Sequence, residues 1–79
     1  MTVVQMDREI DARGLACPGP LLSLIGAIRE EQVGCVIAVL SSDAGSRTDI
    51  PAWTAKAGHE LVEVDDEDGY ARFVIRKSR

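Results

Sequence analysis

The sequence Leu15-Ala16-Cys17-Pro18-Gly19-Pro20 places a cysteine directly before a segment, residues 21–28, whose apolar side chains recur with helical spacing. Apolar residues stand at positions i, i+3, i+4 and i+7 from Leu21, as on one buried face of a helix. We expect a helix over about residues 18–31, followed by a left-handed residue near Gly34. The cysteine is therefore expected to lie at the beginning of this helix.

The two prolines indicate where the helix begins. Proline suits the first turn, because the N–H that it lacks has no partner within the helix there. With Pro18 first and Pro20 third in the helix, Cys17 becomes the N-cap residue, and Gly19 carries the free N–H nearest to it. Gly19 also has no side chain, so a reacting partner can approach the cysteine sulfur closely.

A cysteine at this position is suited to sulfur chemistry. A helix N-terminus behaves like roughly half a positive charge, which favours the thiolate and lowers the thiol pKa below its free value of about 8.5. The thiolate is the nucleophilic form. The alternative is that Cys17 is a small apolar filler beneath the helix, but a filler needs no rigid run of proline and glycine after it.

Residues 11–20, Asp11-Ala12-Arg13-Gly14-Leu15-Ala16-Cys17-Pro18-Gly19-Pro20, resemble the Cys-Pro-x-Pro signature of the TusA/SirA family of small sulfur carriers. The resemblance continues, in the same order along the chain, at Ser42-Asp43, Thr48-Asp49-Ile50-Pro51, Gly58-His59-Glu60-Leu61 and Phe73-Val74-Ile75-Arg76-Lys77. It implies that Cys17 carries a persulfide. The donor would be a cysteine desulfurase or a rhodanese-type protein, and the acceptor a sulfur-relay or biosynthetic protein. No cofactor is expected, because the sulfur travels covalently.

The predicted first helix departs from one part of the family. Relatives that feed tRNA thiolation tend to carry basic residues along it, whereas here Ile25 and Gly26 occupy that region and only Arg29 is basic. This departure counts against the partners of tRNA thiolation and does not affect the role of Cys17. The sequence does not choose between tRNA thiolation, molybdenum-cofactor supply and sulfur oxidation. Gly26 costs a helix about 1 kcal/mol relative to alanine, which suggests close packing, either inside the domain or against a partner helix or second subunit.

Length and composition exclude several classes of protein. The 79 residues predict one domain, residues 1–79. A net charge of −4 argues against direct nucleic-acid contact. No apolar run is long enough to span a bilayer and no signal peptide is recognisable, so we expect a soluble, cytoplasmic protein without membrane contact. Cys17, Cys35 and His59 are too scattered for a metal site.

Alternating and unbroken apolar patterns predict the strands. Residues 1–13 alternate apolar and polar side chains, with Arg8 as an exception on the apolar side. Residues 35–40 are all apolar, as in a central strand buried on both faces. Residues 60–77 form two alternating runs around an acidic turn that ends in Gly69, which indicates a β-hairpin.

A second helix is expected between the central strand and the hairpin. It begins either at Ser46, which opens a capping-box pattern, or after Asp49, and it ends at Gly58. The element order is then β-α-β-α-β-β. Right-handed crossovers would place both helices on one face of a four-stranded mixed sheet. The predicted fold is α+β, a two-layer α/β sandwich, which the family resemblance also implies.

Other residues near the predicted site have two interpretations each. Asp11 and Arg13 either orient the loop that includes Gly14 and contact the donor, or simply end a solvated strand. Cys35 is either structural or a resolving thiol. His59 is either a proton relay or a residue placed after a helix C-terminus, where a cation is favoured. For the whole chain, the alternative to a sulfur carrier is a non-catalytic regulatory or RNA-binding module with the same fold.

Overall fold

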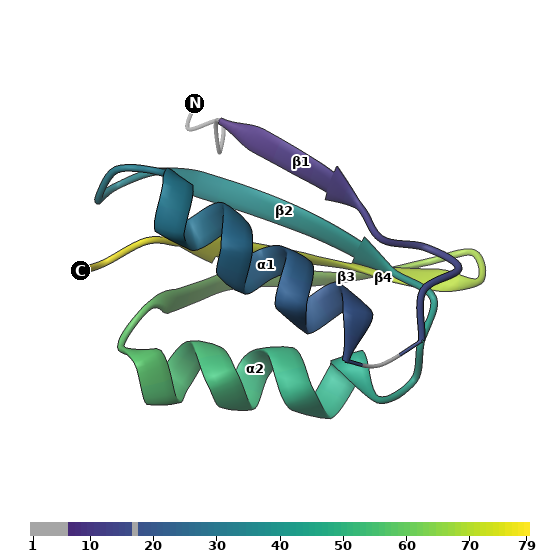
Figure 1. Ribbon diagram of the computed structural model, residues 1–79. Helices are drawn as coiled ribbons and strands as arrows, with labels where there is room; N and C mark the ends of the chain where they lie inside the picture. The colour runs from purple at the N-terminus through teal and green to yellow at the C-terminus, as the bar shows by residue number, and fades with distance from the viewer. Residues whose placement is uncertain (1–6, 17) are drawn as a thin grey trace.

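The elements of the chain follow one another in the predicted order, β-α-β-α-β-β (Figure 1). The structure is a computed structural model and describes residues 7–16 and 18–79. None of the helices in these residues is both long enough and apolar enough to cross a membrane. The elements are β1 (Arg8–Asp11), α1 (Gly19–Glu30), β2 (Val36–Ser41), α2 (Ser46–Ala57), β3 (Glu60–Glu67) and β4 (Tyr70–Arg76).

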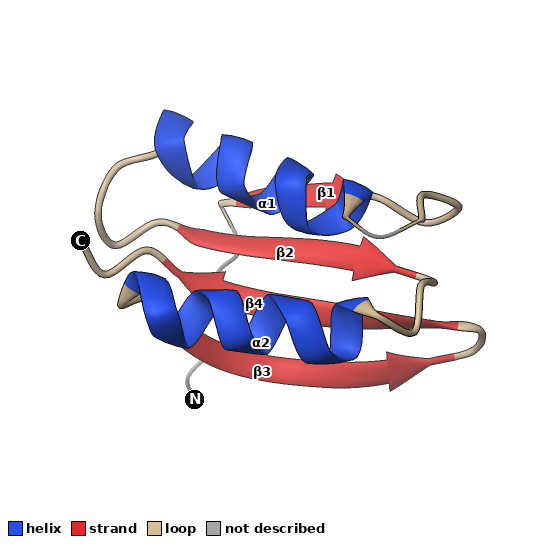
Figure 2. Cartoon of the chain, turned by 60° about the horizontal axis from the view of Figure 1, so that its bottom comes forward, coloured by secondary structure: helices blue, strands red, loops and turns tan. Residues whose placement is uncertain are grey.

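The four strands form one mixed sheet in the order β1-β2-β4-β3. Strand β1 runs parallel to β2, and the other two pairings are antiparallel. Both helices cover the same face of this sheet, as Figure 2 shows. The predicted two-layer sandwich is therefore confirmed.

The main core lies between the sheet and the two helices. Leu24 of α1 and Ile50 of α2 pack there against inward-facing strand residues, among them Val39 and Phe73. Every residue of β2 is buried, as its unbroken apolar sequence predicted. On the helix-free face, Ala38 packs with Val36, Val74 and Val62.

The described part of the first strand is shorter than predicted, since β1 ends at Asp11. The prediction for residues 1–6 lies outside the described residues. Arg8, the exception in the apolar pattern, has a structural reason. Its guanidinium donates to Glu30 at 2.8 Å and to Glu31 at 3.2 Å, so it ties β1 to the C-terminal end of α1.

Helix α1 begins one residue later than predicted. Pro18 is its N-cap, and Pro20 is its second residue. The assignment of Cys17 as N-cap and Pro18 as first helical residue is therefore wrong, because the Pro18 backbone is not helical while its carbonyl already accepts the Leu22 N–H at 2.9 Å. At the other end Glu31 is the C-cap, and Gly34, with φ +96°, lies in the following turn.

The buried face of α1 is rotated slightly from the predicted stripe. Ala27 is buried where Ile25 was expected, and both Leu21 and Ile25 are only half-buried. Pro20 contributes to the buried face as well, so the first turn of the helix rests on the core. Leu22 remains 59% exposed on the outer face.

Helix α2 begins at Ser46, which confirms one of the two predicted starts and makes Asp49 as the cap wrong. Gly45 is the N-cap, and the buried Ser46 hydroxyl instead hydrogen-bonds that of Ser41 at 2.7 Å. Pro51 consequently lies inside the helix. Gly58 ends it with φ +83°, as predicted.

Candidate functional site

Both helices begin at the same end of the sheet (Figures 1 and 2). The β1–α1 connection, residues 12–18, and the β2–α2 connection, residues 42–45, meet there. Helix N-termini are the positive ends of the helix dipole. Cys17, the predicted nucleophile, lies outside the described residues, so the site is built from the residues around it.

The residues on either side of position 17 are accessible. Ala16 and Pro18 are both exposed, and Leu15 is 48% exposed. The Gly19 N–H is not free as predicted, because it donates to the Ala16 carbonyl at 2.8 Å and closes a tight turn. A Cβ on Gly19 would lie 3.1 Å from the Leu15 Cβ, so the glycine leaves room for a side chain of the loop itself.

A second turn precedes this one and is joined to a neighbouring loop. Gly14 has φ +87°, a conformation that favours glycine. Its N–H donates to the Ser42 hydroxyl oxygen at 2.9 Å. The Leu15 N–H donates to the Ala12 carbonyl at 3.2 Å. The loop before position 17 is therefore ordered by hydrogen bonds that its own sequence does not reveal.

Asp11 and Arg13 form a clamp at the start of the loop. The Arg13 guanidinium makes two hydrogen bonds to the Asp11 carboxylate, both 2.8 Å long, and the Arg13 N–H makes a third at 3.1 Å. The guanidinium carbon also lies 4.8 Å from the centre of the Tyr70 ring. Hydrogen bonding by Arg13 holds the pKa of Asp11 down at about 2, and Asp11 raises the pKa of Arg13. The pair is exposed at the end of β1, and its hydrogen bonds and the Tyr70 ring hold it in place.

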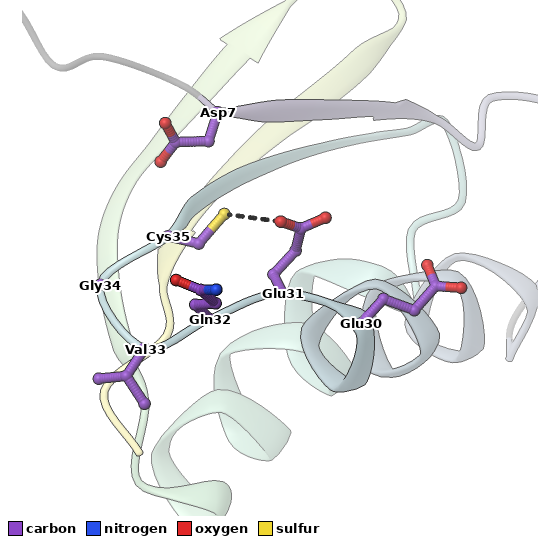
Figure 3. A pocket seen from close by; sticks show the side chains of 7 residues that line it. All are labelled: Asp7, Glu30, Glu31, Gln32, Val33, Gly34 and Cys35. Atoms are coloured by element: carbon purple, nitrogen blue, oxygen red, sulfur yellow. Dashed lines mark hydrogen bonds between the residues drawn. The ribbon is translucent and has the colours of Figure 1, made fainter.

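Cys35 lies at the opposite end of α1, which at twelve residues is about 18 Å long. Its thiol faces Glu31 across 3.6 Å in an acidic pocket of about 420 Å³ (Figure 3). Burial raises the pKa of the Cys35 thiol, and the carboxylates of Glu31 and Asp7 raise it further. Cys35 is therefore not brought to the loop around position 17, which counts against a resolving role.

His59 also lies away from that loop, after the C-terminal end of α2. Its Nδ1 accepts the Ser78 N–H at 3.1 Å, and its ring lies 5.6 Å from that of Trp53. Burial, followed by the charges of Lys77 and Arg79, lowers the pKa of His59. The structure therefore supports neither a proton relay to the loop nor a favoured cation.

Metal binding and the packing of Gly26 were the remaining questions from the sequence. Among residues 7–16 and 18–79, no three His, Cys, Asp or Glu side chains are grouped to hold a metal ion.

A Cβ on Gly26 would meet nothing within 4 Å. Packing inside the domain is therefore the wrong explanation for this glycine, and docking of a partner remains a prediction.

Sequence reasoning missed two residues that contact the loop. Ser42 entered only through the family resemblance, and Tyr70 was treated as an ordinary hairpin residue. Their contacts join segments that are far apart in the chain, so no local pattern indicates them. The Ser42-Asp43 pair was the one available signal.

Comparison with known proteins assigns the family. A family model described as "Sulfurtransferase TusA" matches residues 8–77. A putative sulfur carrier protein from Archaeoglobus fulgidus is 54% identical over 68 residues, which are 86% of this chain and 93% of that protein. Sulfur carrier protein TusA of Pseudomonas aeruginosa is 39% identical over 72 residues, 91% of each chain.

A solved structure agrees with this assignment. The crystal structure of a SirA-like protein from Desulfitobacterium hafniense matches with a TM-score of 0.81 and 27% sequence identity. The match covers 91% of this chain and 99% of the other. Because the family model and the relatives span nearly the whole chain, this protein belongs to the TusA family of sulfur carrier proteins, which relay sulfur.

Proposed function

We propose that Cys17 is the residue that carries the sulfur, as the persulfide Cys17–S–SH. The observation that carries this proposal is the geometry of its neighbours. Ala16 and Pro18 are exposed, and Pro18 is the N-cap of α1. Exposed residues on both sides of position 17 and a helix that begins beside it support a thiol that another protein can reach and a thiolate that the helix end stabilises.

Sulfur enters and leaves by two exchange steps of the same kind. The Cys17 thiolate attacks the outer sulfur of a donor persulfide, the donor's S–S bond breaks, and the donor departs as a thiolate. An acceptor thiolate then attacks the outer sulfur of Cys17–S–SH, and Cys17 departs as a thiolate. No net oxidation occurs in either step. Thiolate fraction, leaving-group pKa and access set the rates of such exchanges, so stabilising the Cys17 thiolate helps most as it leaves.

The other residues of the motif support the loop in this proposal. Asp11 and Arg13 orient the first part of the loop, and Gly14 allows its left-handed turn. Pro18, Gly19 and Pro20 form the beginning of the helix. Because the Arg13 charge is balanced by Asp11 at 2.8 Å, we assign Arg13 to orienting the loop.

The partners of a sulfur carrier are proteins that give and take sulfur. We propose a cysteine desulfurase or a rhodanese-type protein as donor, and a sulfur-relay or biosynthetic protein as acceptor. A cytoplasmic location suits this role, because reducing conditions keep a carrier thiol free. A regulatory or RNA-binding module is the competing proposal, and the net charge of −4 disfavours RNA.

Intact-mass measurement tests the carrier site. The protein is incubated either with a desulfurase and cysteine or with polysulfide. Wild type and the Cys35→Ser variant should each gain the mass of one sulfur atom, and Cys17→Ser should gain none. Sulfur retained by Cys17→Ser would overturn the assignment of the site, and no gain by wild type with any donor would favour the non-catalytic module.

A further inference from the structure

We propose that Ser42 is a positioning residue for the loop that carries Cys17, an inference that rests on the proposed function of that cysteine. Its hydroxyl oxygen accepts the Gly14 N–H at 2.9 Å, across 28 positions of sequence. Ser42 acts through the backbone of the loop, three residues before the sulfur.

The contact continues the pairing of β1 with β2 beyond the strands. The last backbone hydrogen bond between these segments joins the Ala12 N–H to the Leu40 carbonyl at 2.9 Å. After it the two chains enter their loops, and the Ser42 hydroxyl supplies the next connection. The remaining hydrogen bonds of loop residues 13–16, within the described part of the chain, run to positions 11, 12 and 19. Within the described part of the chain, Ser42 thus provides the hydrogen bond that joins loop residues 13–16 to another loop.

The loop that presents Ser42 is itself firmly held. The buried Ser41 hydroxyl pairs with that of Ser46, at the beginning of α2, at 2.7 Å. The Asp43 N–H donates to the Ser41 hydroxyl oxygen at 3.2 Å, and the Asp43 carbonyl accepts the Ser46 N–H at 3.2 Å. Ser42 lies within this network, so it offers Gly14 an acceptor whose position is fixed by α2.

The position of the loop affects the reactivity of Cys17, because the electrostatic influence of a helix end is short-ranged. The favourable effect on a thiolate falls off within about one helical turn. A loop released from Ser42 would sample positions farther from the beginning of α1, and its thiol pKa would move toward the free value of about 8.5. Losing the Ser42 hydroxyl should therefore reduce the reactivity of Cys17 while leaving the fold intact.

The test compares Ser42→Ala, Ser42→Thr and Ser78→Ala in a Cys35→Ser background. Ser78 is a matched control, because it is exposed and its hydroxyl makes one hydrogen bond, 3.3 Å to the Arg76 carbonyl, at the other end of β4. Alkylation of Cys17 by iodoacetamide is followed against pH, polysulfide loading is followed by mass, and thermal unfolding checks the fold.

Ser42→Ala should slow alkylation at pH 7 by about threefold and move the midpoint of its pH profile upward. Ser42→Thr, which keeps the hydroxyl, should restore the profile, and Ser78→Ala should not change it. A Ser42→Ala profile that coincides with wild type, or an equal shift in Ser78→Ala, would overturn the inference. Alkylation needs no sulfur donor, so a chain that is alkylated normally but never loaded with sulfur contradicts the proposed function instead.

Discussion

The two ends of α1 offer a cysteine opposite surroundings. At the N-terminal end, exposed residues flank position 17 and two helices begin side by side. At the C-terminal end, Cys35 faces Glu31 and Asp7, and its thiol pKa is raised. The same side chain is thus expected to be a nucleophile at one end and an inert thiol at the other. Burial is the first cause of the raised pKa of Cys35, the carboxylates of Glu31 and Asp7 add to it, and helix direction should add to the difference between the two ends.

The two ends also differ in how their backbone groups are used. Lys77 donates to the carbonyls of Ile28 and Glu31, at 2.7 and 2.6 Å, and so caps the C-terminal end of α1. Arg8 adds an ion pair with Glu31 at 3.2 Å. The C-terminal end is therefore closed by the chain itself, whereas exposed side chains surround the beginning of the helix.

Replacing Lys77 with methionine should give the largest change in stability. The substitution removes two charge-assisted hydrogen bonds to helix carbonyls, and we expect a loss of about 2 kcal/mol in the free energy of unfolding. Urea titration measures it. Arg76→Met is the control, because it removes only an exposed ion pair with Glu60 of 3.1 Å and should cost about 0.5 kcal/mol. Equal losses would show that Lys77 does not cap α1.

Changing Gly26 to alanine should stabilise α1 between the two ends compared above. Its Cβ position is open, so Gly26→Ala should raise the free energy of unfolding by about 0.5–1 kcal/mol. Gly58→Ala is the opposite control, because φ is +83° there and Arg79 would lie 2.6 Å from the new Cβ. Destabilisation by Gly26→Ala would contradict this account. Slower sulfur transfer despite higher stability would support a partner that docks over Gly26.

Neutralising Glu31 should partly remove the difference between the two thiols. Glu31→Gln lowers the pKa of Cys35, because a neutral amide no longer repels the thiolate, and alkylation of Cys35 at pH 8 should become about two- to threefold faster. Glu30→Gln is the control, since Glu30 bonds to Arg8 rather than to the thiol. If the two variants behave alike, burial rather than charge suppresses Cys35.

Periodicity was enough to predict the architecture. The apolar run before Ser41, the alternation in the hairpin and the spacing after Leu21 each reflect a face that must be buried, so element order and layering followed from them. Capping was less predictable. Pro18 fits either the N-cap or the first helical position, and only the carbonyl that accepts the Leu22 N–H decides between them.

The surroundings of the site were predictable only in part. Cys17 and the residues after it could be selected because helix position and residue type bear on thiol chemistry. The contact of Gly14 with Ser42, and of Arg13 with Tyr70, depends on which loops meet at the end of the sheet. Likewise, Asp7 approaches Cys35 because β1 pairs with β2, where the Asp7 carboxylate accepts the Val36 N–H at 2.9 Å.

The most direct test compares the two thiols within one wild-type chain. The protein is alkylated briefly across a range of pH, and the modification of each cysteine is quantified by peptide mass spectrometry. Each profile rises as its thiol loses its proton. We predict a midpoint for Cys17 below the free-thiol value of about 8.5 and one for Cys35 above it. Coincident midpoints, or Cys35 titrating first, would contradict the claim that α1 separates a reactive thiol from an inert one.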